Sequence, residues 1–148
     1  PNSAARWQYA GCDQNADGRL EFEETFHRTL AMPAIKDGLL VITDLAGLVH
    51  CLDAETGKVH WTYDMLAAVW AGPLVADGKV FVADEDGDVC VFALSAEPKL
   101  LAENNMEESV YGTPVAVDDT LYIATTSHLV AIGKTGGEED KAGAAETQ

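Results

Sequence analysis

A block of about forty residues recurs along the chain, and it constrains the fold more than any other feature of the sequence. Each copy begins with a proline and a short apolar run that ends in an acidic turn, at Pro33–Gly38, Pro73–Gly78 and Pro114–Asp119. Successive copies lie 40 and 41 residues apart. A fixed period of this length indicates one supersecondary unit that is repeated along the chain.

Within each copy, short runs rich in Val, Ile and aromatic residues alternate with turn residues. Asp-Gly at positions 37–38 and 77–78 separates two apolar runs, which is a strong hairpin signal. Further glycine turns follow, so the pattern predicts four short strands per unit, as in one blade of a β-propeller. A β-sandwich is the alternative, but sandwiches do not repeat their turn residues at constant spacing. The predicted fold is therefore all-β, with about three blades of four antiparallel strands that belong to a larger ring.

The first copy resembles the PQQ-like, or quinoprotein-type, β-propeller repeat. Residues 51–61 read C-L-D-A-E-T-G-K-V-H-W, and blades of that family end in A-x-D-x-x-T-G-K-x-x-W. The resemblance covers residues 33–132 and weakens after the first copy. It implies that Trp61 packs between neighbouring blades, that Trp7 is the remnant of an earlier blade, and that the protein is extracytoplasmic, either periplasmic or secreted.

About three blades are too few to close a ring, since propellers contain about four to eight. The chain begins at Pro1 without a methionine or a leader, so we expect it to be the C-terminal part of a longer propeller. The expected divisions are the end of a preceding blade (1–11), an inserted calcium loop and helix (12–32), propeller blades (33–132) and a disordered acidic tail (133–148).

Residues 13–24 match the calcium-binding loop of an EF-hand, D-x-[DN]-x-[DN]-G-x5-E, at every defining position. Calcium takes about six to eight oxygen ligands, and this spacing turns alternate side chains of a tight loop inward. Arg19 would contribute its main-chain carbonyl group. The alternative is an acidic turn that caps a helix. The predicted metal ligands are Asp13, Asn15, Asp17, Arg19, Glu21 and Glu24.

The sequence predicts a short helix over Glu23–Leu30, because Phe22, Phe26 and Leu30 fall on one helical face. The preceding segment, Trp7–Gly11, reads as the end of a strand, so the motif is half of an EF-hand and modest affinity is expected.

The repeat spacing places this motif in a connection between blades. Trp7 and Pro33 are 26 residues apart, whereas Trp61 and Pro73 are 12 apart. The 14 extra residues are about one calcium loop and the start of its helix, and connections between blades tolerate such insertions.

The formal net charge is −16, from 9 Lys and Arg against 25 Asp and Glu. Nucleic acids and anionic membranes would repel such a chain, so the charge favours a cationic or neutral partner or a metal. The longest nearly uncharged stretch, Met65–Ala76, is too short to span a bilayer.

Other candidate sites are weaker. Cys12, Cys51 and Cys90 are an odd number without a C-x-x-C pair, so neither a disulfide framework nor a zinc site is indicated and their redox state stays open. His50 beside Cys51 suggests a metal or nucleophile site, although a structural role is favoured. The acidic run Asp84–Asp88 could hold a cation, but its place in the repeat favours a solvated turn.

Two functions remain open. The favoured one is a calcium-binding, non-catalytic module of an exported protein, with no catalytic residues, which docks an unknown protein or cell-envelope component beside upstream blades of its own polypeptide. The alternative is part of a PQQ-dependent alcohol or sugar dehydrogenase whose cofactor site lies mostly in other blades. Enzymes of this family carry a vicinal Cys-Cys pair, which this segment lacks. PQQ is thus a possible cofactor that these residues do not support.

Overall fold

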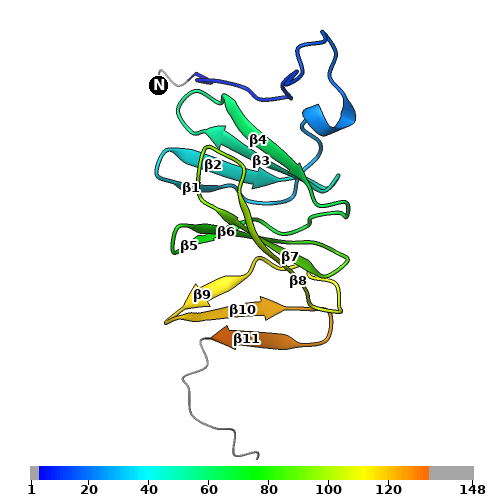
Figure 1. The fold of residues 1–148 in the computed structure, drawn as a ribbon, viewed down its shortest axis with the longest axis vertical. Helices are drawn as coiled ribbons and strands as arrows, with labels where there is room; N and C mark the ends of the chain where they lie inside the picture. Colours follow the sequence, from blue (N-terminus) through cyan, green and yellow to red (C-terminus); the bar gives the residue numbers. More distant parts are fainter. Residues whose placement is uncertain (1–3, 134–148) are drawn as a thin grey trace, which may run out of the picture.

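The computed structural model describes residues 4–133, which form three antiparallel sheets stacked one on the next (Figure 1). The first sheet contains β1 (Ala34–Lys36), β2 (Leu39–Thr43), β3 (Leu48–Asp53) and β4 (Val59–Asp64) in sequence order. The second contains β5 (Leu74–Ala76), β6 (Lys79–Ala83), β7 (Asp88–Ala93) and β8 (Leu100–Asn105). The third contains β9 (Val115–Val117), β10 (Thr120–Ala124) and β11 (Leu129–Gly133). The prediction of an all-β fold with repeated antiparallel blades is confirmed.

The first hairpin of each sheet is a two-residue turn in which both residues have positive φ. Asp37 and Gly38 have φ of 51° and 79°, and the second copy repeats this conformation at Asp77 and Gly78. The third copy has Asp118 and Asp119 there, at 47° and 63°. Turns of this kind match the right-handed twist of the strands, which explains the recurring Asp-Gly signal.

The strand registers of the first two sheets correspond residue by residue. Ile42 pairs with His50 in the first sheet as Val82 pairs with Cys90 in the second. Cys51 lies opposite Trp61, and its counterpart Val91 lies opposite Ala102. Ala102 therefore occupies the repeat position of Trp61.

Trp61 fills the interface between the first two sheets. Its side chain is 3% exposed and belongs to a buried apolar cluster drawn from both sheets. The indole Nε1 donates a hydrogen bond of 3.0 Å to the Ser95 carbonyl oxygen, and its ring lies 5.5 Å from that of Phe92. This packing agrees with the role that the family resemblance gives this tryptophan.

The N-terminal segment covers the other face of the first sheet (Figure 1). Trp7, Tyr9 and Phe26 pack there against a small cluster of buried aliphatic side chains: Leu40, Ile42 and Leu52. The face of β2 and β3 that lies away from the second sheet is thereby kept from water.

The predicted helix over Glu23–Leu30 is wrong. The structure has a single 3₁₀ turn, η1 (Phe22–Glu24), after which the chain is extended. Thr25 forms an antiparallel bridge with Gly11, and the Phe26 amide donates to the Ala10 carbonyl at 3.1 Å. These bonds to the incoming chain replace those that a helix would form.

The disordered tail predicted over 133–148 lies outside the described residues, apart from Gly133 at the end of β11. Within residues 4–133 no helix has the length and apolar character needed to cross a membrane.

Candidate functional site

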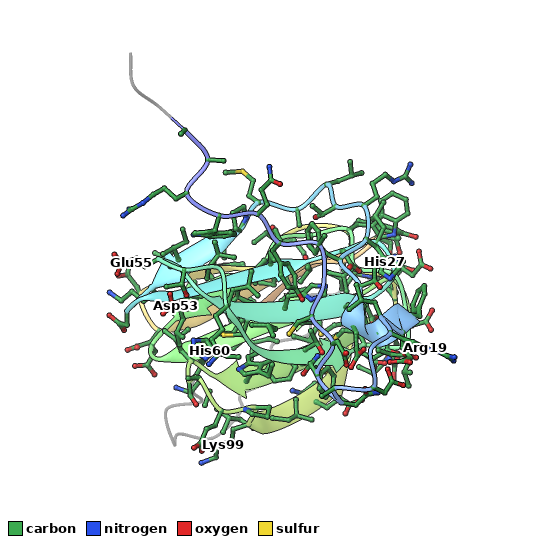
Figure 2. The ribbon with its side chains drawn as sticks, turned by 90° about the horizontal axis from the view of Figure 1, so that it is seen from above. Arg19, His27, Asp53, Glu55, His60 and Lys99 are labelled. Atoms are coloured by element: carbon green, nitrogen blue, oxygen red, sulfur yellow. The ribbon has the colours of Figure 1, made fainter. Side chains whose placement is uncertain are left out.

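Residues 12–24 form a loop that is closed at its base by main-chain contacts. The Cys12 amide donates to the Glu24 carbonyl at 2.9 Å, next to the Gly11–Thr25 bridge. A Cβ atom at Gly11 would collide with the Glu24 carbonyl oxygen, so this close approach requires glycine. Figure 2 shows Arg19 of this loop near His27, on one side of the molecule. Asp53 and Glu55 lie on the opposite side.

The first half of the loop is wound around its own acidic side chains. The Asp13 carboxylate accepts the amides of Asp17 and Gly18, at 3.2 and 2.8 Å. The Asn15 side-chain oxygen accepts the Asp17 amide at 2.9 Å, and the Asp17 carboxylate accepts the Arg19 amide at 2.9 Å. Gly18 has φ of 88°, which is the turn that its place in the motif requires.

The second half of the loop folds back over the first. Glu24 is 7% exposed, and its carboxylate accepts the amides of Gln14 and Asn15 at 2.8 and 3.3 Å. The Asn15 side-chain amide donates to the Glu21 carboxylate at 3.2 Å. The residues at the two ends of the motif therefore lie against one another.

Glu21 and Glu24 are adjacent acids whose ionisation is linked. A hydrogen bond to Glu24, with burial and the Glu24 charge, raises the pKa of Glu21. Burial alone would raise the pKa of Glu24, but hydrogen bonds from the Gln14 amide and from Glu21 outweigh it and lower that pKa. Two carboxyl groups in this relation favour a shared proton or a shared cation.

The structure does not gather all six predicted ligands around one point. Within residues 4–133, no three His, Cys, Asp or Glu side chains converge as a metal-binding group. The carboxylates of Asp13, Asp17 and Glu24 instead accept hydrogen bonds mainly from main-chain amides of the loop. The ligand set stays a prediction.

A polar chain that is buried at His50 and Asp44 links the segments on either side of the loop to the first sheet. The Tyr9 hydroxyl lies 3.2 Å from His50 Nδ1, and His50 Nε2 lies 3.1 Å from Asp44 Oδ2. The same carboxylate oxygen accepts the His27 amide at 3.0 Å. Burial would raise the pKa of Asp44, but the hydrogen bonds from His50 and His27 lower it.

His50 and Cys51 do not act together. They are successive residues of β3, so they point to opposite faces of the sheet: His50 towards Tyr9 and Cys51 into the cluster shared with the second sheet. Burial raises the pKa of Cys51 to about 11 and that of Cys90 to about 12, which keeps both thiols protonated. The structural role that the sequence favoured for this pair fits these contacts.

The acidic run Asp84–Asp88 forms the β6–β7 turn, which agrees with its place in the repeat. Asp84 is fully buried, and its Oδ1 accepts the amides of Asp86 and Asp88 at 3.0 and 2.9 Å. Its Oδ2 is a buried side-chain oxygen with no hydrogen-bond partner among the described residues. Burial raises its pKa.

Sequence reasoning missed a polar cluster at the matching turn of the third sheet. The Glu108 carboxylate accepts hydrogen bonds from the hydroxyls of Thr125 and Ser127 and lies 3.1 Å from His128 Nδ1. These contacts lower the pKa of Glu108 to about 2. Ser127 and Glu108 both contact the same ring nitrogen, so the group is not a nucleophile–base relay. The only sequence signal is Thr125, at the repeat position of Asp44 and Asp84.

The amino-acid sequence matches a family of known proteins. Residues 6–143 match the family model described as "Outer membrane protein assembly factor BamB". A 1-butanol dehydrogenase (cytochrome c) from Thauera butanivorans is 29% identical over 124 residues, which covers 74% of this chain and 17% of that enzyme.

Solved structures share the fold. The crystal structure of BamB from Moraxella catarrhalis has a TM-score of 0.60 and 21% identity, over 70% of this chain and 33% of that one. A quinohemoprotein alcohol dehydrogenase from Pseudomonas putida HK5 has a TM-score of 0.58 and 24% identity, over 64% of this chain and 16% of that one. The chain thus spans a third or less of the length of each of these three proteins.

Proposed function

Because the chain belongs to the family of PQQ-repeat β-propeller proteins described as outer membrane protein assembly factor BamB, we propose that it is a calcium-stabilised, non-catalytic binding module of an exported protein. We propose an extracytoplasmic setting because one relative is an outer membrane protein assembly factor, from Shewanella oneidensis. The partner would be a protein or another component of the cell envelope, and further propeller blades would adjoin these sheets.

The observation that carries the calcium proposal is the position of Glu24. This residue closes the motif, is nearly buried, and already turns its carboxylate back over Gln14 and Asn15. An EF-hand loop needs a bidentate glutamate there. On binding, Ca²⁺ would draw the carboxylates of Asp13, Asp17 and Glu24 away from the amides that they now accept.

Calcium would act on the fold through the base of the loop. Glu24 is three residues from His27, whose amide is held by Asp44, and Phe26 lies 5.2 Å from the His50 ring. The Gln14 side chain also donates to Thr62 of β4 at 2.9 Å. A loop held rigid by a metal would therefore keep the N-terminal segment on the first sheet, and no chemical step is required of it.

Terbium luminescence with calcium competition tests this proposal in the native polypeptide that carries the chain. We expect saturable terbium emission that calcium removes, and at a calcium concentration of 100 Kd a stabilisation of about 2.7 kcal/mol. Glu24→Gln should abolish both effects. Glu23→Gln, one residue away and outside the ligand pattern, is the matched control. Equal binding by the two variants would contradict the proposal.

The alternative function is part of a PQQ-dependent alcohol dehydrogenase, which the similarity to the two dehydrogenases favours. Cys51 and Cys90 are buried, protonated thiols on different sheets rather than a reactive pair. Any PQQ site would thus depend on other blades. Stoichiometric PQQ absorbance that stays with the native polypeptide through gel filtration would favour this alternative over a non-catalytic module.

A further inference from the structure

We propose that the groove between the second and third sheets is a binding site for a planar aromatic cation, namely one or two fused rings that carry an amine. The cavity has a volume of about 640 Å³ and is lined by residues of the β5–β6 hairpin and of the third sheet. The proposal does not depend on the calcium loop or on the proposed function.

The groove corresponds to the place that Trp61 fills in the preceding interface. Trp61 is buried in a cluster with Val41 of the first sheet and with Val80 and Phe92 of the second. By repeat register, the counterparts of these three residues are Phe81, Leu121 and Ile132. All three line the groove.

The side chain that should fill the groove is missing. Ala102 stands at the repeat position of Trp61, and neither it nor any other residue of β7 or β8 is among the residues that line the groove. Ile132 lies on the edge strand β11 and is 46% exposed, whereas its counterpart Phe92 lies on β7, between two other strands, and is 1% exposed.

The walls suit a flat ring. Phe81 lines the groove from β6, and Leu121 and Ile132, which are paired across β10 and β11, line it from the third sheet. Aromatic groups gain about 0.5–1.5 kcal/mol from ring contacts beyond the burial of area. A mostly apolar cleft with a few polar groups at its mouth is the usual form of a small-molecule site.

The mouth of the groove selects a positive charge. Lys79 also lines it, but the Lys79 ammonium lies 2.8 Å from the Asp77 carboxylate. Asp118 and Asp119 line the opposite side, and no lysine or arginine within residues 4–133 forms an ion pair with either. The excess negative charge there, on a chain of net charge −16, favours an amine over an acid.

Tryptamine is the probe, titrated into the native polypeptide and followed by calorimetry and by NMR. We expect saturable binding and chemical-shift changes at the Phe81 ring and at the Leu121 and Ile132 methyl groups. Ala102→Trp should fill the groove and remove saturable binding. Ala124→Trp, which places the same side chain on the exposed opposite face of the third sheet, is the matched control and should bind as the unmodified protein does.

Tryptophol, the neutral alcohol with the same ring, tests the charge. It should bind about twofold to fivefold more weakly than tryptamine, which is the range expected of an exposed ion pair. The replacement of both Asp118 and Asp119 by Asn should remove that difference. Equal affinity for the two ligands in the unmodified protein would overturn the cationic part of the proposal.

The site itself would be overturned by unchanged tryptamine binding in Ala102→Trp, or by the absence of saturable binding in the unmodified protein. If Ala102→Trp does not fold, the NMR shifts of the unmodified protein decide. Changes confined to residues that line the groove support the site, and changes spread elsewhere refute it.

Discussion

The two interfaces between neighbouring sheets have the same strand register but are filled differently. Between the first and second sheets, ten buried residues form one cluster around Trp61. Between the second and third, four buried residues form the cluster, and Ala102 stands where the tryptophan would be. The two interfaces therefore differ at the repeat position of Trp61, and a groove lies between the second and third sheets.

The first two sheets also differ in the turn between their second and third strands, where each has a buried aspartate. Asp44 and Asp84 are both fully buried, and each accepts main-chain amides of its own turn. Asp44 also bonds to His50, whereas Asp84 has an unpartnered oxygen and Cys90 at the position of His50. The first sheet thus satisfies a buried charge that the second leaves unsatisfied.

The largest expected effect is that of Trp61→Ala. It removes a buried ring and leaves a cavity, so the free energy of unfolding should fall by about 3–5 kcal/mol in urea denaturation. Trp70→Ala is the control, because Trp70 is 40% exposed and its one hydrogen bond is to Glu85 at the surface. A loss for Trp70→Ala as large as that for Trp61→Ala would contradict the comparison of interfaces.

Asp44→Asn should have the next largest effect. It weakens charged hydrogen bonds to His50 and the His27 amide, which should cost about 1.5–3 kcal/mol at neutral pH. Because the folded-state pKa of Asp44 is lowered, its stabilisation is present above the pKa of the unfolded chain and is lost as pH falls through the folded pKa. The loss caused by Asp44→Asn should therefore shrink in acid, as urea denaturation at several pH values would show. Asp64→Asn, in a turn at the end of β4, is the control and should change little.

Asp84→Asn should have the smallest effect and the opposite sign. The amide keeps the oxygen that accepts Asp86 and Asp88 and removes a buried charge, so stability at neutral pH should be unchanged or rise by about 1 kcal/mol. The folded-state pKa of Asp84 is raised, so its penalty is present above the folded pKa and disappears as pH falls below the pKa of the unfolded chain. The same pH series measures this gain. A loss equal to that of Asp44→Asn would show that Asp84 has a partner after all.

The strands were predictable because their signals are local. The Asp-Gly turns and the apolar runs beside them recur at constant spacing, and the strands lie where those signals predict. The helix over Glu23–Leu30 was not predictable in this way. Its apolar spacing fits a helix, but Phe26 packs on the first sheet while Phe22 stays 55% exposed, because bonds to Ala10 and Gly11 hold the chain extended. Pairing with a distant segment overrode local periodicity.

The candidate sites also differ in whether local sequence signals could predict them. The calcium motif could be found because its ligands are close together in the sequence. The Glu108–His128 cluster and the groove beside Phe81 could not, because each needs residues about 20 to 50 positions apart to meet. Even so, the presence of alanine rather than tryptophan at position 102 can be read from the sequence once the register of the repeat is known.

The sequence by itself determined the repeat, the strand order within each unit, the turns and the family, since all of these arise from neighbouring residues and are copied at a fixed period. Only the tertiary structure decided which interfaces between sheets are filled by side chains and which buried polar groups have hydrogen-bond partners. Whether Trp61 meets Phe92, whether Asp44 meets His50, and whether a groove remains between the second and third sheets depend on the tertiary packing. That packing brings together residues whose separation along the chain carries no local signal.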